Sequence, residues 1–251
     1  MIDAHNHLQD PRLLGKQDQL IAEMKAVGIT GCVVNGTSEA DWPAVSALAT
    51  KHPGFIFPAF GLHPWKVDER SPIWLETLLD YLQKHPTATL GECGLDRWIK
   101  NPDLDAQHLV FQQQLDLALR LDRPVTIHCL KAWGPLLKEL RNLTYLPKFL
   151  LHSFNGSLET AQELLPLGAH FSFSGHFLHP RKEKLRQTFT QLPSDRLMIE
   201  TDAPDMSPPN PKHSLQDLNH PTNLPQVAKE LTRLTKTPIE QFTLNTLDFF
   251  D

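Results

Sequence analysis

The stretch Phe111–His128, FQQQLDLALRLDRPVTIH, joins a helical pattern to a strand pattern. Apolar side chains recur at helical spacing in its first part, at Phe111, Leu115, Ala118 and Leu119. The β-rich run Pro124–His128 follows after a short polar turn. A helix that leads directly into a short apolar strand is the repeating unit of a parallel α/β sheet.

The same alternation extends in both directions along the chain. We expect eight strands, at Met1–Ala4, Gly31–Asn35, Phe55–Phe60, Thr87–Leu90, Pro124–His128, Lys148–His152, His170–Ser174 and Arg196–Glu200. A second helical face, between the third and fourth of these, carries Leu75, Leu78, Leu79 and Leu82. Eight such units that close on themselves form a (β/α)8 TIM barrel of typically about 250 residues, so we expect a single α/β domain over residues 1–251. An open doubly wound sheet is the alternative, but no glycine-rich nucleotide-binding motif follows any strand.

The composition excludes several classes of protein. The 24 basic and 29 acidic residues give a net charge of −5, which argues against a protein that coats nucleic acid with a uniformly basic surface. No run of eighteen apolar residues predicts a membrane span, and the first ten residues, MIDAHNHLQD, lack the features of a signal peptide. Three widely spaced cysteines fit a reducing compartment. We therefore expect a cytoplasmic protein with no membrane partner.

Side chains that can bind metal fall at the predicted strand ends. His5 and His7 are two residues apart at the end of the first strand, so alternation directs both imidazoles to one face. Further candidates follow the fourth, fifth, sixth and eighth strands, at Glu92, His128, His152 and Asp202. The carboxyl ends of the strands form the rim where TIM-barrel enzymes place their active sites. The pattern thus predicts one cluster of six ligands.

The chemistry of these residues favours a two-metal centre. Imidazole together with carboxylate suits zinc, manganese or iron, and six ligands exceed the four that a single structural zinc needs. We expect Glu92 to bridge two divalent ions, whose bound water would have a pKa near roughly 7 and supply a hydroxide nucleophile. Asp202 could both bind metal and orient or deprotonate that water.

Six ordered blocks of sequence carry a resemblance to a known family. The blocks are DAHNHL at 3–8, GLHP at 61–64, GECGLD at 91–96, PVTIHC at 124–129, LHSF at 151–154 and IETDAP at 199–204. In this order they resemble the TatD family of metal-dependent hydrolases. Gln107 and Gln114 match the helix between the fourth and fifth strands of that family.

The resemblance implies a TIM barrel with two divalent ions (zinc, manganese or magnesium). Its ligands would be His5, His7, Glu92, His128, His152 and Asp202, with Asp202 and Glu92 as the catalytic carboxylates. The implied activity is that of a deoxyribonuclease, often acting from a 3′ end of DNA or RNA, although some relatives are D-aminoacyl-tRNA deacylases. His63 matches a position that would contact a substrate phosphate; alternatively, it caps the backbone near Pro64.

The chain also departs from the family pattern. The family carries an arginine two residues after the histidine of the fifth strand, where this chain has Leu130. The next residue, Lys131, could bind phosphate as a single charge, or it could be a solvated residue at the start of a helix. Lys212 is the only lysine or arginine between Ala203 and Asn223, within a long proline-rich stretch. Fewer cations weaken the expectation of a polynucleotide substrate, because phosphate neutralisation supplies much of such affinity.

The predicted function is hydrolysis of phosphodiesters at DNA or RNA ends. The alternatives are a small-phosphoester hydrolase and a metal-dependent deacylase or amidohydrolase; a non-enzymatic metal-bound scaffold ranks below these, since all six ligand positions are filled. Several other residues have open roles. Cys93 and Cys129 are expected to be buried thiols, Glu200 could orient a ligand histidine, and His176 could line the pocket. Trp65 and Trp133 follow strand ends and could either stack on a base or pack in the core.

Overall fold

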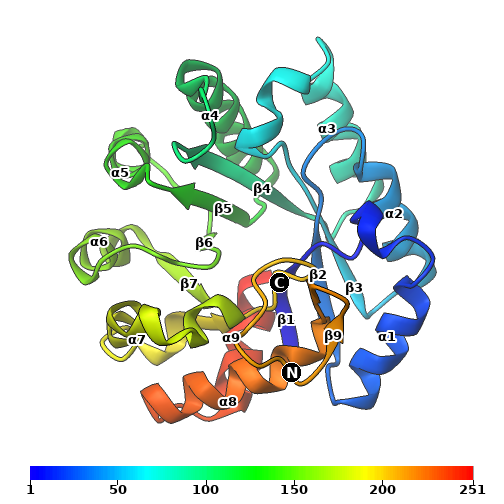
Figure 1. The fold of residues 1–251 in the computed structure, drawn as a ribbon. Coiled ribbons are helices and arrows are strands. Elements are labelled where there is room, and N and C mark those ends of the chain that lie inside the picture. Colours follow the sequence, from blue (N-terminus) through cyan, green and yellow to red (C-terminus); the bar gives the residue numbers. More distant parts are fainter. Residues whose placement is uncertain (251) are drawn as a thin grey trace.

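The computed structural model describes residues 1–250 and contains the predicted TIM barrel (Figure 1). Eight parallel strands pair in chain order in one sheet. They are β1 (Ile2–Asn6), β2 (Gly31–Asn35), β3 (Ile56–Phe60), β4 (Thr89–Asp96), β5 (Val125–Leu130), β6 (Phe149–Leu151), β7 (Ala169–Phe173) and β8 (Leu197–Ile199). The eight strands predicted from the alternation are therefore all present.

The barrel is brought nearly to closure by contacts between the two ends of the sheet. The backbone N–H of Asp202 donates to the carbonyl of His5 at 2.9 Å, and the N–H of His7 donates to the carbonyl of Ala203 at 2.8 Å. The segment that follows β8 thus lies against the end of β1. Residues separated by almost the whole chain become neighbours at the carboxyl rim.

Helices surround the strands on the outside (Figure 1). They are α1 (Gln17–Ala26), α2 (Trp42–Lys51), α3 (Trp74–Lys84), α4 (Leu104–Leu121), α5 (Trp133–Asn142), α6 (Leu158–Leu164), α7 (Glu183–Phe189), α8 (Leu224–Thr235) and α9 (Ile239–Phe250). Both helical faces predicted from the leucine and phenylalanine spacing are found, in α3 and α4. The parallel strands are buried on both faces, as expected where helices cover a closed sheet. No helix in the part of the chain that the structure describes combines the length and apolar character needed to cross a membrane.

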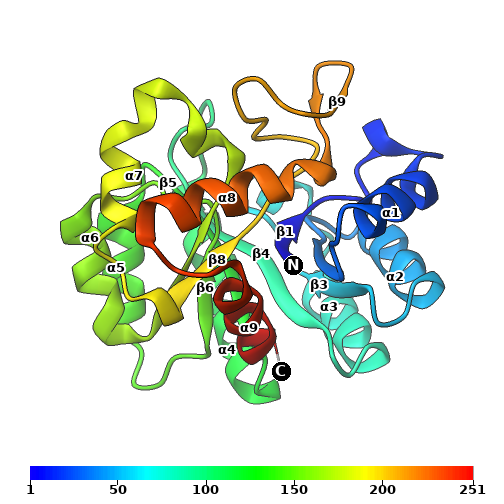
Figure 2. The ribbon, with the colours of Figure 1, turned by 90° about the horizontal axis from the view of Figure 1, so that it is seen from below.

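The two ends of the barrel are built differently (Figure 2). At one end Phe249 of α9 packs against the strand residues Ala4, Leu150 and Met198. At the other end a short hairpin, β9 (Ser214–Leu215) and β10 (Leu218–Asn219), stands out from the rim within the proline-rich stretch. Asn219 anchors this hairpin, because its backbone N–H donates to Pro204 and its side chain donates to the carbonyl of Thr201 at 2.8 Å.

Short 3-10 helices occupy several of the remaining connections. They are η1 (Pro11–Leu13), η2 (Pro64–Glu69), η3 (Leu165–Leu167), η4 (Gly175–Leu178), η5 (Pro180–Lys182), η6 (Ser194–Arg196) and η7 (Pro221–Asn223). Of these, η2 and η4 follow the carboxyl ends of β3 and β7, so they contribute to the rim.

The fourth strand differs most from its prediction. We expected it to end at Leu90, but β4 continues to Asp96, so Glu92 lies inside the strand and not at its end. The reason is that Gly94 brings β4 very close to β5: a Cβ at this position would overlap the backbone carbonyl of His128. A glycine in a strand permits such a close approach of two backbones. His128 likewise lies within β5 and not at its end.

Cys93 and Cys129 match their prediction as buried thiols, and Cys32 is buried as well. Cys32, Cys93 and Cys129 are all free and buried. Burial raises the pKa of each thiol above its usual range, so the thiols remain protonated and unreactive.

Candidate metal centre

Four ligand atoms converge at the carboxyl rim between β1, β4 and the segment after β8. Nε2 of His5 lies 3.1 Å from Nε2 of His7, and each lies 3.4 Å from Oε2 of Glu92. Oδ1 of Asp202 is 3.5 Å from the first imidazole nitrogen and 3.3 Å from the second. All four side chains are buried or nearly so. We call these four residues group A.

A second set of ligand atoms surrounds the other oxygen of the Glu92 carboxylate. Oε1 of Glu92 lies 2.7 Å from Nε2 of His152, 2.9 Å from Nδ1 of His128 and 3.3 Å from Nε2 of His63. The nitrogens of His128 and His152 are 3.2 Å apart. These four residues form group B. The two oxygens of one carboxylate therefore face two different groups of imidazoles.

The spacing within group A fits a bound cation. Four ligands at about 2.0–2.1 Å from an ion in a tetrahedron are about 3.3–3.4 Å apart. The five measured separations in group A run from 3.1 to 3.5 Å. Imidazole with carboxylate is a donor set for zinc, manganese or iron. The residues present could therefore hold a metal ion.

Hydrogen bonds behind the imidazoles determine which nitrogen faces the centre. Nδ1 of His7 lies 2.8 Å from the carbonyl of Asn35 and therefore carries the proton, which leaves Nε2 free as a ligand. Nε2 of His128 lies 2.9 Å from Oδ2 of Asp96 and is protonated in the same way, which leaves Nδ1 free. A metal ion that displaces the second proton of each ring would therefore bind at Nε2 of His7 and Nδ1 of His128.

The electrostatics of the site reflect close packing of buried imidazoles and carboxylates. Burial acts to raise the pKa of Glu92, but the facing imidazoles, His152 and His63 first, outweigh it and hold that pKa well below its usual range. Burial acts to lower the pKa of His7, yet its bonds to Asp202 and Glu92 raise it well above the usual range. Burial lowers the pKa of His63 to about 4, so this ring is neutral. The centre thus keeps its two carboxylates ionised, as metal ligands must be.

A layer of buried polar residues supports the site from beneath. Glu200, which is fully buried, approaches Nδ1 of His152 with Oε1 at 3.5 Å, and Ser172 donates to its other oxygen. Asp3 accepts hydrogen bonds from both the backbone N–H and the hydroxyl of Thr201, at 2.9 and 2.5 Å. These contacts hold the segment that leads into Asp202.

Asp96 is a site residue that the sequence reasoning missed. Besides His128, its Oδ2 accepts a hydrogen bond from the indole N–H of Trp65 at 2.7 Å. Gln107 of α4 fixes the backbone of Asp96 by bonding to both its N–H and its carbonyl. The available signal was strand alternation: residues 92, 94 and 96 share a face once β4 is known to continue past Leu90.

Three further residues that the sequence suggested for substrate binding differ in their contacts. His63 caps η2, because its Nδ1 accepts the backbone N–H of Trp65 at 3.1 Å, and its Nε2 simultaneously faces Glu92. The observed position of His63 as a backbone cap is thus also compatible with a contact to a substrate phosphate. Lys131 follows β5 immediately at the carboxyl rim, with an exposed side chain that belongs to neither group. Trp133 packs against Phe154 with ring centroids 5.0 Å apart, which favours the core-packing alternative for this tryptophan.

His176 lies at the start of η4, after the carboxyl end of β7. Burial lowers the pKa of His176 to about 4, with the cations Lys182 and Arg181 acting in the same direction. The carboxylate of Asp202 acts on the pKa of the same ring in the opposite direction. His176 is half-buried and belongs to neither group of ligands.

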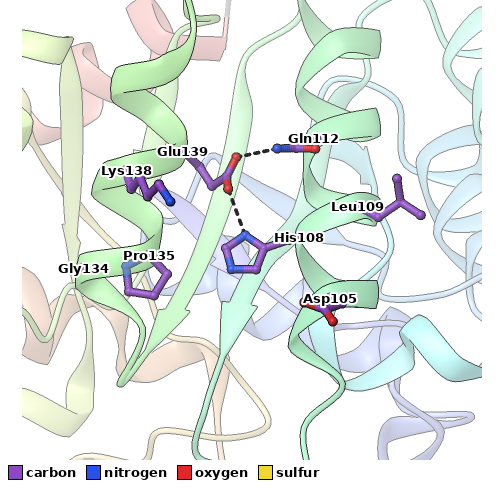
Figure 3. Close-up of a pocket in the computed structure, with 8 residues that line it drawn as sticks. All are labelled: Asp105, His108, Leu109, Gln112, Gly134, Pro135, Lys138 and Glu139. Carbon is purple, nitrogen blue, oxygen red and sulfur yellow. Dashed lines mark hydrogen bonds and ion pairs between the residues drawn. The ribbon is translucent and has the colours of Figure 1, made fainter.

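A separate groove lies outside the barrel, between α4 and α5 (Figure 3). Glu139 stands at its middle and contacts His108 at 3.1 Å and Gln112 at 2.6 Å. Asp105 and Lys138 line it further along. Its polar groups pair with one another across the two helices, and none of the three-ligand groups found among the described residues lies there. The candidate metal-binding groups of the described residues therefore lie at the carboxyl rim of the barrel and not in this groove.

The chain is similar to known proteins over almost its whole length. The model of a family described as TatD related DNase matches residues 2–250. An uncharacterized metal-dependent hydrolase, YjjV of Escherichia coli K12, is 30% identical over 96% of this chain and 92% of that protein. The 3′-5′ ssDNA/RNA exonuclease TatD of Erwinia billingiae is 32% identical over 93% of this chain and 91% of that protein. The crystal structure of the Escherichia coli YjjV protein superimposes with a TM-score of 0.90 at 29% identity, covering 99% of this chain and 95% of that one.

Proposed function

The chain belongs to the TatD-related DNase family of metal-dependent hydrolases, and we propose that it hydrolyses the phosphodiester at the 3′ end of single-stranded DNA or RNA with two divalent ions. The observation that carries this proposal is the position of Glu92, whose two oxygens face group A and group B separately. A carboxylate in this position can bridge two ions, and a pair of ions is suited to an in-line displacement at phosphorus.

The ligand assignment follows from the distances. His5, His7, Asp202 and Oε2 of Glu92 would hold one ion, and His128, His152 and Oε1 of Glu92 would hold the other. When bound, two such ions stabilise the negative charge that develops on a phosphoryl group and lower the pKa of a nearby water.

The side chains of this chain supply proton transfer and orientation. Asp202 is ionised, since its neighbouring imidazoles, His7 first, hold its pKa below the usual range against the effect of burial. A buried ionised carboxylate at the centre can accept the proton of the attacking water. His63 is neutral, and its Nδ1 already accepts the N–H of Trp65, so its proton lies on Nε2. That N–H can donate to a phosphate oxygen next to Glu92.

Lys131 completes the proposed substrate contacts. It stands at the carboxyl end of β5 next to the helix α5, with an exposed ammonium group. A single flexible charge at this place can attract a phosphate but does not grip it with two parallel hydrogen bonds, as an arginine does.

The pairing of the rim arginine Arg12 with carboxylates favours one second candidate, a small phosphoester. Arg12 lies at this rim, but its guanidinium already bonds Asp10 and Asp205, at 2.7 and 2.6 Å. Leu130 and Lys131 stand where the family carries an arginine segment. A small ester needs fewer phosphate contacts than a polynucleotide does.

The test is metal-supplemented hydrolysis of end-labelled single-stranded DNA beside a small aryl phosphodiester. Wild-type protein is compared with Asp202→Asn, and with Asp195→Asn, which removes an exposed carboxylate at the opposite end of the barrel. We expect wild-type protein to release terminal nucleotides one after another. Asp202→Asn should lower the rate of release at least about 100-fold, whereas Asp195→Asn should leave it unchanged. Cleavage of the small ester without loss of DNA would favour the second candidate. Equal activity of all three proteins would contradict the role of Asp202.

A further inference from the structure

One large apolar side chain at the metal centre is left open to solvent. Trp65 of η2 is 49% exposed, although its ring centroid lies only 5.1 Å from that of His63 and 6.4 Å from that of His128. Both imidazoles meet it edge to face. An indole plane therefore forms part of the wall of the site.

The indole is held in place by polar contacts. Its N–H donates to Oδ2 of Asp96 at 2.7 Å, and this carboxylate is completely buried. Its backbone N–H donates to Nδ1 of His63 at 3.1 Å. The ring is thus fixed at both its attachment point and its far end. A fixed aromatic ring loses little conformational entropy when it binds a partner.

Of the other four tryptophans, three are packed and one is exposed. Trp42 and Trp74 are buried in the core, and Trp133 packs against Phe154. Trp98 is 59% exposed, but only its backbone N–H is tied to Asp96. Trp65 alone combines an exposed ring, a hydrogen-bonded indole and contact with the histidines of group B.

The indole of Trp65 is suited to bind the base of a nucleotide. Arg12 is paired to two carboxylates, so this rim cation is not free to bind a phosphate, and a base-stacking contact would add affinity that Arg12 does not supply. Bases without a stacking neighbour, as at the end of a single strand, present a flat apolar face. Stacking on an aromatic side chain is independent of base identity and is worth a substantial part of the affinity per base.

We propose that Trp65 stacks on the base of the terminal nucleotide whose phosphodiester lies at the metal centre. This inference rests on the proposed nuclease function and specifies its substrate class: single-stranded ends that carry an intact, unpaired terminal base. Trp65 then determines specificity by binding the base, while its N–H to Asp96 maintains the orientation of the ring.

The experiment compares two oligonucleotides that differ only at the 3′-terminal residue, which is either a thymidine or an abasic deoxyribose analogue. The variants are Trp65→Ala, Trp65→Phe and a matched control, Tyr145→Ala. Tyr145 is 77% exposed, but it lies between α5 and β6, at the opposite end of the barrel. For release of thymidylate we expect Trp65→Ala to raise KM roughly 5- to 100-fold with little change in kcat. Trp65→Phe, which keeps an aromatic face, restores most of the affinity.

The abasic substrate separates stacking from a structural role. If Trp65 stacks on the base, all four proteins process the abasic end with similar KM. If Trp65 served only to position Asp96 and His128, Trp65→Ala would impair both substrates equally, and Trp65→Phe, which lacks the indole N–H, would be as impaired as Trp65→Ala. Either of these results would overturn the proposal, as would an unchanged KM in Trp65→Ala.

A binding measurement adds a readout that does not depend on turnover. In an Asp202→Asn background, titration with the thymidine-ended oligonucleotide should quench tryptophan fluorescence, and the additional substitution Trp65→Phe should remove most of the quenching. Undiminished quenching in the double variant would count against stacking. Nucleotide release by wild-type protein with no effect at Trp65 would overturn this inference alone, whereas no release and no quenching would overturn the proposed function as well.

Discussion

Nδ1 of His152 faces Oε1 of Glu200 at 3.5 Å, and the two side chains are 6% and 0% exposed. Nε2 of the same imidazole lies 2.7 Å from Glu92, so the ring stands between two carboxylates. Ser172 donates to the second oxygen of Glu200 and orients the carboxyl group. A buried carboxylate behind an imidazole fixes the tautomer and strengthens the nitrogen that faces the metal.

This arrangement predicts that Glu200→Gln weakens metal binding. The substitution preserves the shape of the side chain but removes the charge behind His152, so we expect metal affinity to fall about 10- to 100-fold. The measurement is competition with a chromophoric chelator. Glu76→Gln, at an exposed position of α3, is the matched control and should bind as wild type does. Equal affinity in Glu200→Gln and wild type would show that Glu200 does not orient the ligand.

Metal binding should also stabilise the fold, because the ligands come from distant parts of the chain. At a free metal concentration about 100 times the dissociation constant, linkage contributes about 2.7 kcal/mol, or roughly 5–10 °C in Tm for a chain of this size. A chelator should remove this increment. In His5→Ala the shift should be much smaller, since a buried member of group A is missing. A shift in His5→Ala as large as in wild type would place the bound ion elsewhere.

The close approach of β4 to β5 depends on Gly94. Its φ is +142°, and a Cβ there would overlap the carbonyl of His128. We expect Gly94→Ala to destabilise the protein by about 3 kcal/mol or more, because both strand backbones must shift. Gly134→Ala is the matched control: it lies in α5 with open space around the new methyl group, so it should stabilise by about 0.5–1 kcal/mol. Chemical denaturation of both variants tests the contrast, and equal free energies of unfolding would refute it.

A histidine far from the metal centre should make stability depend on pH. Burial, followed by the charge of Arg196, lowers the pKa of His170 from its usual 6.5 to about 4. The folded state therefore disfavours the charged ring, and its contribution to stability is complete above about pH 6.5 and is lost as the pH falls toward 4. Between these limits wild type should lose roughly 1 kcal/mol more than His170→Gln, after allowance for solvent screening. Parallel stability curves for the two proteins would disprove this assignment.

Much of the fold and the list of candidate ligands follows from local pattern. Apolar spacing within 111–119 and 75–82 defines helices whatever the rest of the chain does, and the short β-rich runs between such helices define strands. Because parallel strands in βα units all point the same way, residues that follow strands must gather at one rim. His5, His128 and Asp202 could therefore be placed near one another before any contact was known.

The details of the centre depend on contacts between strands, which no local pattern encodes. The extension of β4 to Asp96 arises from pairing with β5, and it turns Asp96 toward His128. The two-sided position of Glu92 depends on the register shift between Leu90 and Cys93.

The amino-acid sequence by itself determined which elements form and which chemical groups reach the rim, because periodicity and side-chain chemistry are properties of neighbouring residues. Only the tertiary structure decided which oxygen of Glu92 faces which imidazoles, and that Asp96 and Glu200 stand behind His128 and His152. These relationships depend on the register of the strands and the closure of the barrel, where a shift of one residue would turn each side chain to the opposite face.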